Sequence, residues 1–231
     1  MKIAVCGSQN TGKSTFIKDF ISKWPMYKQP EKSYRDFLKE KNIKINTEGN
    51  QESQNLILNA LIDQAMAYPR EENTFLIYDR CPLDNLAYTF WLNFYKPDKV
   101  SENFLQTTVD LVKNSLKFFD IIFFTPISAS SPIPYLDNKN NPHRSLDATF
   151  REEINNILQG FLISYSKNDG RVFPVQDSPA FIEIIGNQEE RIELASLYIN
   201  EKGKAFEEQE SLLIDSIHNI PEEYQNSNLL A

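Results

Sequence analysis

Four residues near the start of the chain, Gly7, Gly12, Lys13 and Ser14, have types and spacing that suit phosphate chemistry. They form the pattern G-x-x-x-x-G-K-S in the stretch GSQNTGKST, although the 231-residue chain contains only seven glycines. Glycines let the backbone wrap around an anion, the lysine reaches the outer phosphates of a nucleotide, and the serine hydroxyl can bind Mg²⁺. The spacing therefore predicts a loop that binds nucleotide phosphates together with a metal ion.

This pattern is that of a P-loop, and its flanking sequence agrees with that interpretation. The apolar run KIAVC precedes it, and STFIKDFISKW follows with apolar residues on one face of a helix. In a strand, loop and helix so ordered, the N–H groups of the loop and of the helix start converge on one anion. We expect Lys13 to hold the β and γ phosphates and Ser14 to bind the metal. The residues expected to contact the nucleotide are Gly7, Asn10, Thr11, Gly12, Lys13, Ser14 and Thr15.

A second charged group follows the apolar stretch NTFLIYDR, which predicts a buried strand that ends at Asp79 and Arg80. Ligands of open parallel sheets bind at the carboxyl ends of the strands. Asp79 is therefore placed to bind Mg²⁺ or to accept a proton, and Arg80 has a guanidinium suited to phosphate. An aspartate that caps the next helix is the alternative for Asp79.

Two further pairs have weaker sequence signals. Glu31 and Arg35 are four residues apart, a spacing that also suits a surface ion pair on a helix. Arg144 and Arg151 are seven residues apart, beside a segment rich in proline, serine and asparagine that has the composition of a lid. Arginines at the mouth of a lid would neutralise charge on a transferring phosphoryl group, and a solvated helix face is the alternative.

The rest of the sequence predicts the elements that position these residues. Short apolar runs predict strands at 2–6, 73–80, 120–125 and 171–175. Amphipathic stretches predict helices from about 33 and at 51–68, 83–95, 101–119, 146–165 and 189–200, with Ser101 as an N-cap. The alternation of strands and helices predicts one α/β domain with a central parallel sheet and helices on both faces. Together with the P-loop motif, this predicts a P-loop NTPase three-layer sandwich. We expect this domain at 1–200, its lid at about 126–150, and a docked helix or loose tail at 201–231.

Composition limits the classes of protein that the chain can belong to. Hydrophobic residues make up 41% of the chain, which favours a folded protein, and a net charge of −8 argues against a broad grip on nucleic-acid backbone. A local basic cleft stays compatible with that charge.

Cys6 and Cys81 are expected to be structural thiols, and we assign no zinc site. No segment suits a signal peptide or a membrane span, so we expect a cytoplasmic protein. The aromatic stretch AYTFWLNFY would suit either a homodimer interface or a core.

Several of these motifs occur together in one known family. The P-loop, E-x-x-x-R, the strand ending in D-R, LDNLAY, SLDATFREEI and IIGNQEERIELASLYI follow one another over about residues 1–200. This order resembles the P-loop small-molecule kinases, most closely the ribosylnicotinamide-kinase-like branch with an AAA-type ATPase domain, and more distantly thymidylate and deoxynucleoside kinases. The resemblance implies that ATP and Mg²⁺ are the cofactors and that 1–200 is a P-loop kinase domain.

The same resemblance implies a role for each residue at its own position. Asp79 would organise Mg²⁺ or activate the acceptor hydroxyl, and Arg80 would contact phosphate. The residues implied to face the acceptor are Glu31, Arg35 and Asp84, and those implied to close from the lid are Arg144 and Arg151. The segment Gly186–Glu190, with Asn187, would lie near the adenine ring of ATP. The proline- and asparagine-rich lid and the segment after residue 200 depart from the family pattern.

The function predicted from these residues is an ATP- and Mg²⁺-dependent kinase that phosphorylates a nucleoside, nucleotide or related small molecule by in-line transfer. Either Asp79 or Glu31 would orient the acceptor. A kinase acting on a hydroxyl of a nucleic acid or a modified DNA base is a second hypothesis, which the net charge disfavours. A regulatory P-loop ATPase is a third. A GTPase is disfavoured, because the nearest string to N-K-x-D is NKNN, which lacks the aspartate that pairs with guanine.

Overall fold

Four short apolar stretches form a parallel sheet in the order β2-β1-β3-β4 within the residues that the structure describes. The strands are β1 (Lys2–Cys6), β2 (Leu76–Asp79), β3 (Ile121–Phe124) and β4 (Ala180–Glu183). This computed structural model describes residues 1–31, 34–41, 43, 45–69, 71, 74–127 and 147–206. The central strands β1 and β3 are buried along their whole length, as is typical of a parallel sheet covered on both faces.

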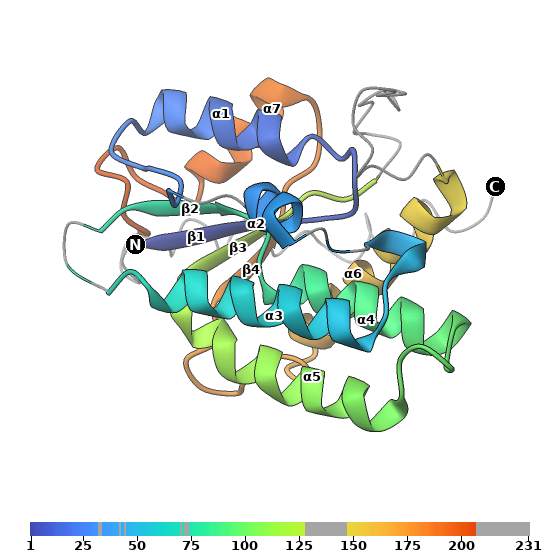
Figure 1. Ribbon diagram of the computed structural model, residues 1–231. Coiled ribbons are helices and arrows are strands. Elements are labelled where there is room, and N and C mark those ends of the chain that lie inside the picture. Colours follow the sequence, from blue (N-terminus) through green and yellow to red (C-terminus); the bar gives the residue numbers. More distant parts are fainter. Residues whose placement is uncertain are drawn as a thin grey trace.

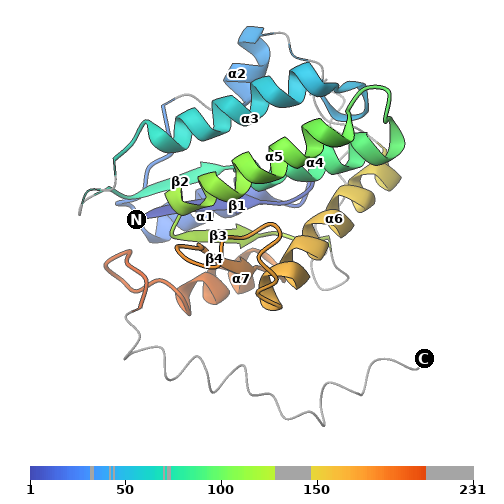
Figure 2. The same cartoon turned by 90° about the horizontal axis from the view of Figure 1, so that it is seen from below.

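Helices cover both faces of this sheet, so the expected three-layer α/β fold is confirmed (Figure 1). On one face lie α1 (Lys13–Lys23) and α7 (Gln188–Ser196). On the other lie α3 (Gln51–Met66), α4 (Pro82–Tyr95), α5 (Glu102–Ser115) and α6 (Ala148–Ser166), and α2 (Tyr34–Lys41) packs on α3 (Figure 2). Single 3₁₀ turns lie at Asn46–Glu48 and Leu116–Phe118.

The alternation of side chains along β1 explains why the core has two halves. Ile3 and Val5 pack in the cluster that contains Phe20 of α1, whereas Ala4 and Cys6 pack in the cluster built from α4, α5 and α6. Successive strand residues point to opposite faces, so one five-residue strand contributes to both layers. Both cysteines are buried free thiols, in agreement with a structural role.

Polar residues just before the helices fix where several of them start. Ser101 accepts a hydrogen bond from Phe104 N, so its predicted role as an N-cap is confirmed. Asp147 caps α6 in the same way, and Asn50 closes a capping box at the start of α3. The cap of α6 fixes the helix turn that carries Arg151.

The strand predicted at 171–175 is wrong, and the fourth strand is β4 at Ala180–Glu183. Val172 and Phe173 are buried in the core, and the ring of Phe173 stacks on that of Phe181, 5.1 Å between centroids. The apolar signal therefore came from residues that fill the core without sheet pairing. Pro174 also lacks the N–H group that a strand interior needs.

The lid expected at about 126–150 falls mainly on 128–146, outside the described residues, and residues 148–150 begin α6. Residues 201–206 of the expected tail are tied to the domain: Ile199 and Ala205 form an antiparallel bridge, and Tyr27 OH donates to Gly203 O at 2.7 Å. The rest of the tail lies outside the described residues.

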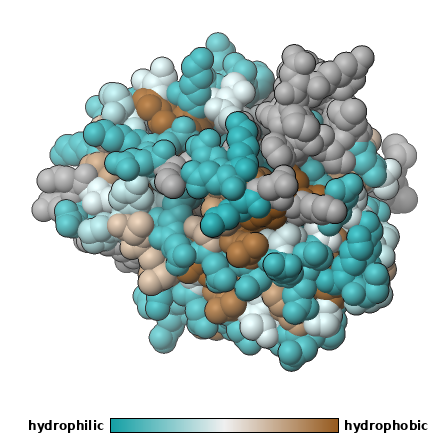
Figure 3. Space-filling view, in the orientation of Figure 1, coloured by the Kyte–Doolittle hydropathy of each residue, from teal (hydrophilic) through white to brown (hydrophobic). Residues whose placement is uncertain are grey.

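The surface in the orientation of Figure 1 is mostly hydrophilic, with hydrophobic residues in small groups (Figure 3). At the end of α4, Phe94 and Tyr95 are 78% and 50% exposed. Exposed rings alone do not test the homodimer, which stays a prediction. None of the described helices combines the length and the apolar character that a membrane span needs.

Candidate active site

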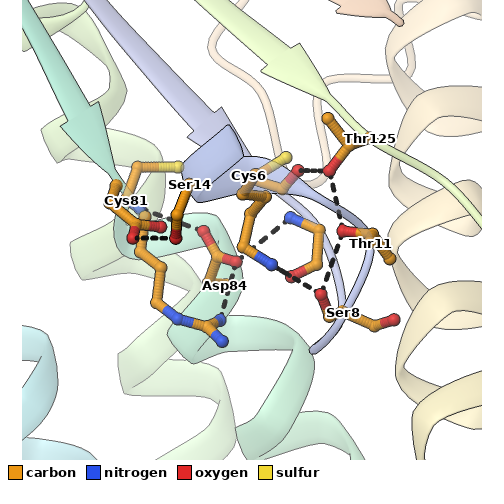
Figure 4. A network of polar contacts seen from close by, with 11 residues as sticks. Cys6, Ser8, Thr11, Ser14, Cys81, Asp84 and Thr125 are labelled. Atoms are coloured by element: carbon orange, nitrogen blue, oxygen red, sulfur yellow. Dashed lines mark hydrogen bonds and ion pairs between the residues drawn. The ribbon is translucent and has the colours of Figure 1, made fainter. Parts of the chain in front are cut away.

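The polar residues that follow β1, β2 and β3 meet at the carboxyl edge of the sheet (Figure 4). The P-loop follows β1, Asp79 ends β2, and Thr125 follows β3. Parallel pairing brings these strand ends together even though they are far apart in the sequence. The site therefore depends on the topology of the sheet as much as on any one motif.

The P-loop is a turn with unusual backbone angles that fits closely against the end of β3. Asn10 and Gly12 have φ angles of 59° and 83°, so their N–H groups can point to the inside of the loop. Gly7 has φ 151°, and a Cβ at that position would lie 2.6 Å from Thr125 Oγ1 and 2.7 Å from its carbonyl oxygen. No larger residue fits at Gly7 without moving backbone.

Hydroxyl groups hold the loop in this position. The Thr11 and Thr125 hydroxyl oxygens are 2.9 Å apart, and each also lies 3.1 Å from a main-chain carbonyl, Ser8 O and Cys6 O respectively. Both threonines are buried. The side-chain amide of Asn10 and the hydroxyl of Ser8 have no hydrogen-bond partner among the described residues although they are shielded from solvent, so the loop has polar groups left for a ligand.

Lys13 folds back over the P-loop. Its Nζ donates to Gly7 O at 2.9 Å and to Ser8 O at 2.5 Å. Burial, and secondarily the charge of Arg80, lowers the pKa of Lys13 to about 7. An incoming anion would favour the charged form of Lys13 and so raise this pKa.

Ser14 and Asp79, the two residues predicted to bind the metal, are in direct contact. Ser14 Oγ donates to Asp79 Oδ2 at 3.0 Å, across 65 positions of sequence. Mg²⁺ takes oxygen ligands and keeps several waters or phosphate oxygens around one or two protein oxygens, so this pair fits it. Among the described residues there is no cluster of three or more histidine, cysteine or acidic side chains that could hold a metal by itself.

Arg80 and Asp84 form an ion pair next to the P-loop, in which Asp84 is buried and Arg80 is half-buried. Arg80 has φ 88°, which is rare for a residue with a Cβ, and its guanidinium donates to Asp84 Oδ1 at 3.0 Å while lying over the ring of Tyr88. The side chains of Arg80 and Asp84 are 16% and 2% exposed. Strained backbone at a strand end often marks a functional position.

Asp84, expected to contact the acceptor, has its carboxylate occupied by the protein. Besides Arg80, it accepts from Gly7 N at 3.2 Å and from Cys81 N at 3.0 Å. Burial raises the pKa of Asp84, and the neighbouring positive charges and N–H groups oppose that rise. The observed contacts make Asp84 an anchor that joins the P-loop to the start of α4.

A shallow pocket lies beside the first turn of α1. It is lined by Gly12, Thr15, Phe16, Gln188 and Arg191. It borders the loop after β4, where the resemblance places adenine. Asn187, expected to bind the cofactor, caps α7 through its side-chain oxygen, which accepts from the N–H groups of the second and third residues after it.

The structure describes the predicted acceptor and lid residues only in part. Glu31 is exposed and precedes α2, so the helical four-residue spacing does not apply to it. Its N–H donates to the hydroxyl of Tyr68 at 3.3 Å. Arg35 lies in α2, but its side chain, like all of Arg144, is outside the described part of the chain. Arg151 is half-buried in the first turn of α6. The roles of these four residues stay predictions.

Comparison with solved structures identifies the fold. The structure is similar to deoxyadenosine kinase from M. mycoides with bound products, with a TM-score of 0.58 and 19% identity over 95% of this chain and all of that one. With dATP bound, the same enzyme gives a TM-score of 0.53 at 22% identity over 84% of this chain and 97% of that one. The NadR protein in complex with NR gives 0.55 at 14% identity, over the whole of this chain and 53% of that one. The chain has the fold of these kinases.

No family model matches this chain, and no curated protein does either. The resemblance to P-loop kinases is thus confirmed at the level of the fold, while identities of 14–22% leave the substrate to be proposed.

Sequence reasoning missed two residues that touch the P-loop. Thr125 ends the stretch DIIFFT, and its position at the carboxyl end of a predicted strand was the available signal. Arg191 lies in the charged stretch QEERIE, which gave no signal of burial, yet it is 2% exposed.

Proposed function

We propose that the protein is an ATP- and Mg²⁺-dependent kinase that transfers a phosphoryl group to a nucleoside, nucleotide or related small molecule. The contact of Ser14 with Asp79, next to Lys13 at the carboxyl edge of the sheet, is the observation that carries this proposal. The similarity in fold to deoxyadenosine kinase and NadR supports it.

The P-loop and Lys13 would bind the donor phosphates. In this proposal Lys13 Nζ leaves the carbonyls of Gly7 and Ser8 and donates to phosphate oxygens. Its pKa then rises from about 7, because an anion favours the charged ammonium. Asn10, whose amide has no partner among the described residues, is available to the same ligand.

Ser14 and Asp79 would hold the metal ion. A bound Mg²⁺ would neutralise charge on the β and γ phosphates during transfer. Ser14 would supply a hydroxyl oxygen and Asp79 a carboxylate oxygen, in place of the hydrogen bond that now joins them.

The acceptor would enter opposite the donor phosphates, where Asp79 or Glu31 would orient its hydroxyl. Arg80 would place positive charge beneath the phosphates, while Asp84 holds the guanidinium. Arg144 and Arg151 would close over the site from the lid and exclude water, which otherwise would waste ATP in hydrolysis.

The test is transfer from γ-labelled ATP with Mg²⁺ to a panel of nucleosides, nucleoside monophosphates, nicotinamide riboside and hydroxyl-bearing modified DNA. Lys13→Ala should abolish transfer, while Lys18→Ala, an exposed lysine of the same helix, should leave it intact. Removing Mg²⁺ with a chelator should have the effect of Lys13→Ala.

The outcomes separate the three hypotheses. Labelled product from a small acceptor supports the proposal and names the substrate class. Label on DNA alone would favour the nucleic-acid kinase. Hydrolysis without any labelled acceptor would contradict the proposal and favour a regulatory ATPase.

A further inference from the structure

Arg191 is a buried arginine that joins the P-loop to the loop after β4. It lies on α7 and is 2% exposed. Its Nε donates to Gly186 O at 3.0 Å, and its Nη1 donates to Thr11 O at 2.7 Å, across 180 positions of sequence. One guanidinium therefore bridges the two loops that border the pocket beside α1.

The third nitrogen of this guanidinium, Nη2, has no hydrogen-bond acceptor within the described residues. No ion pair with a carboxylate is found for Arg191 in that part of the chain either. A buried charge without a counter-charge and with an unsatisfied donor is costly, so such groups are usually completed by a partner. Arg191 also lines the pocket beside α1, so a ligand bound in that pocket is the partner to test for this nitrogen.

The spacing of the pocket residues shows which part of a nucleotide could reach it. Gly12, Thr15 and Phe16 are three and four residues apart and share one face of the first turn of α1, the face toward α7. Lys13 and Ser14 lie between them in sequence and serve the phosphate site. A nucleotide whose phosphates lie at Lys13 has only its nucleoside end left to occupy the pocket.

We propose that Arg191 is a donor-binding residue whose Nη2 donates a hydrogen bond to the nucleoside part of the donor nucleotide in this pocket. This inference rests on the proposed function, because it takes a nucleoside triphosphate as the donor. The other two nitrogens fix the guanidinium in place through Gly186 and Thr11, so the free donor points in a set direction before the nucleotide arrives.

The experiment compares two ligands in the full chain with Mg²⁺ by calorimetry: ATP, and tripolyphosphate, which lacks the nucleoside. Arg191→Met should weaken ATP binding by about 10- to 100-fold, the range for a hydrogen bond from a charged donor. Tripolyphosphate binding should change by less than about threefold. Arg171→Met, an arginine whose side chain is 80% exposed, is the matched control and should change neither.

Equal losses for ATP and tripolyphosphate would overturn the proposal, because they would show that Arg191 only maintains the shape of the P-loop. Unchanged ATP binding would overturn it as well. A wild-type protein that binds neither ligand would instead refute the proposed function, and this inference with it. Should Arg191→Met fail to fold in a thermal melt, Arg191→Lys keeps the charge and takes its place, with the same selective loss of ATP expected.

Discussion

Replacing Asp84 by asparagine tests whether this residue anchors the P-loop or contacts substrate. The change keeps the shape of the side chain but removes its charge. In the wild type the carboxylate accepts from Gly7 N, Cys81 N and the Arg80 guanidinium. An asparagine side chain has one acceptor oxygen, so at least one backbone N–H would face an amide NH₂ group.

The expected cost follows from the burial of the pair. Removing one partner of a buried ion pair costs about 3–5 kcal/mol, and leaving one buried N–H unsatisfied costs about 1–3 kcal/mol. Arg80 keeps 16% of its side chain exposed and can recover some solvation, so the lower part of the combined range applies. We expect Asp84→Asn to lower the free energy of unfolding by about 4 kcal/mol, and the melting temperature by about 10 °C.

The assay is chemical denaturation of the ligand-free protein, followed by circular dichroism. Asp110→Asn, at an exposed aspartate of α5, is the control and should change the free energy of unfolding by less than about 0.5 kcal/mol. Adding Arg80→Met to Asp84→Asn should restore part of the lost stability, since the guanidinium that has lost the Asp84 carboxylate is then removed as well. The anchoring argument fails if Asp84→Asn is as stable as the control and raises only the KM for the acceptor.

Two further predictions concern the P-loop itself. Gly7→Ala should lower the free energy of unfolding by several kcal/mol and abolish nucleotide binding in a thermal-shift assay, because its Cβ would clash with the Thr125 backbone. Gly160→Ala, where a Cβ meets nothing within 4 Å in α6, should be neutral or stabilising. The pKa of Lys13 lies near 7 in the folded protein, below its ordinary 10.5, so the unfolded chain binds more protons between these pH values and the Lys13 contribution to stability rises with pH there. Nucleotide binding should reverse that shift: at pH 8, calorimetry in buffers of different ionisation enthalpy should show proton uptake, and its absence would contradict the assignment.

Local patterns were sufficient for most of the fold. Apolar runs of four to six residues located three strands, and spacing of three and four residues located the helices. The fourth strand was misplaced because Val172 and Phe173 are as apolar and as buried as strand residues. Burial and sheet pairing give the same signal in a sequence, and only the hydrogen-bonded register separates them.

The Ser14 and Asp79 pair was predictable for a reason that does not extend to the rest of the site. Each residue belongs to a local motif at the carboxyl end of a strand, and a parallel sheet must bring such ends together. No such rule predicts the contacts of Asp84. Its three hydrogen-bond donors come from two separate parts of the chain, so its sequence context could suggest a substrate contact but not an anchoring role.

The residues that hold the P-loop in shape are remote from it in sequence, which explains why Thr125 and Arg191 were missed and why the anchoring contacts of Asp84 were not foreseen. Asp84 binds Gly7 from 77 positions away, Thr125 contacts Thr11 from 114, and Arg191 reaches Thr11 from 180. The phosphate-binding groups are therefore specified locally by the motif, while the rigidity of the loop is specified by β3, α4 and α7. A loop held from three elements loses little conformational entropy when a nucleotide binds, so changes at these distant positions should weaken binding even where every residue of the motif is kept.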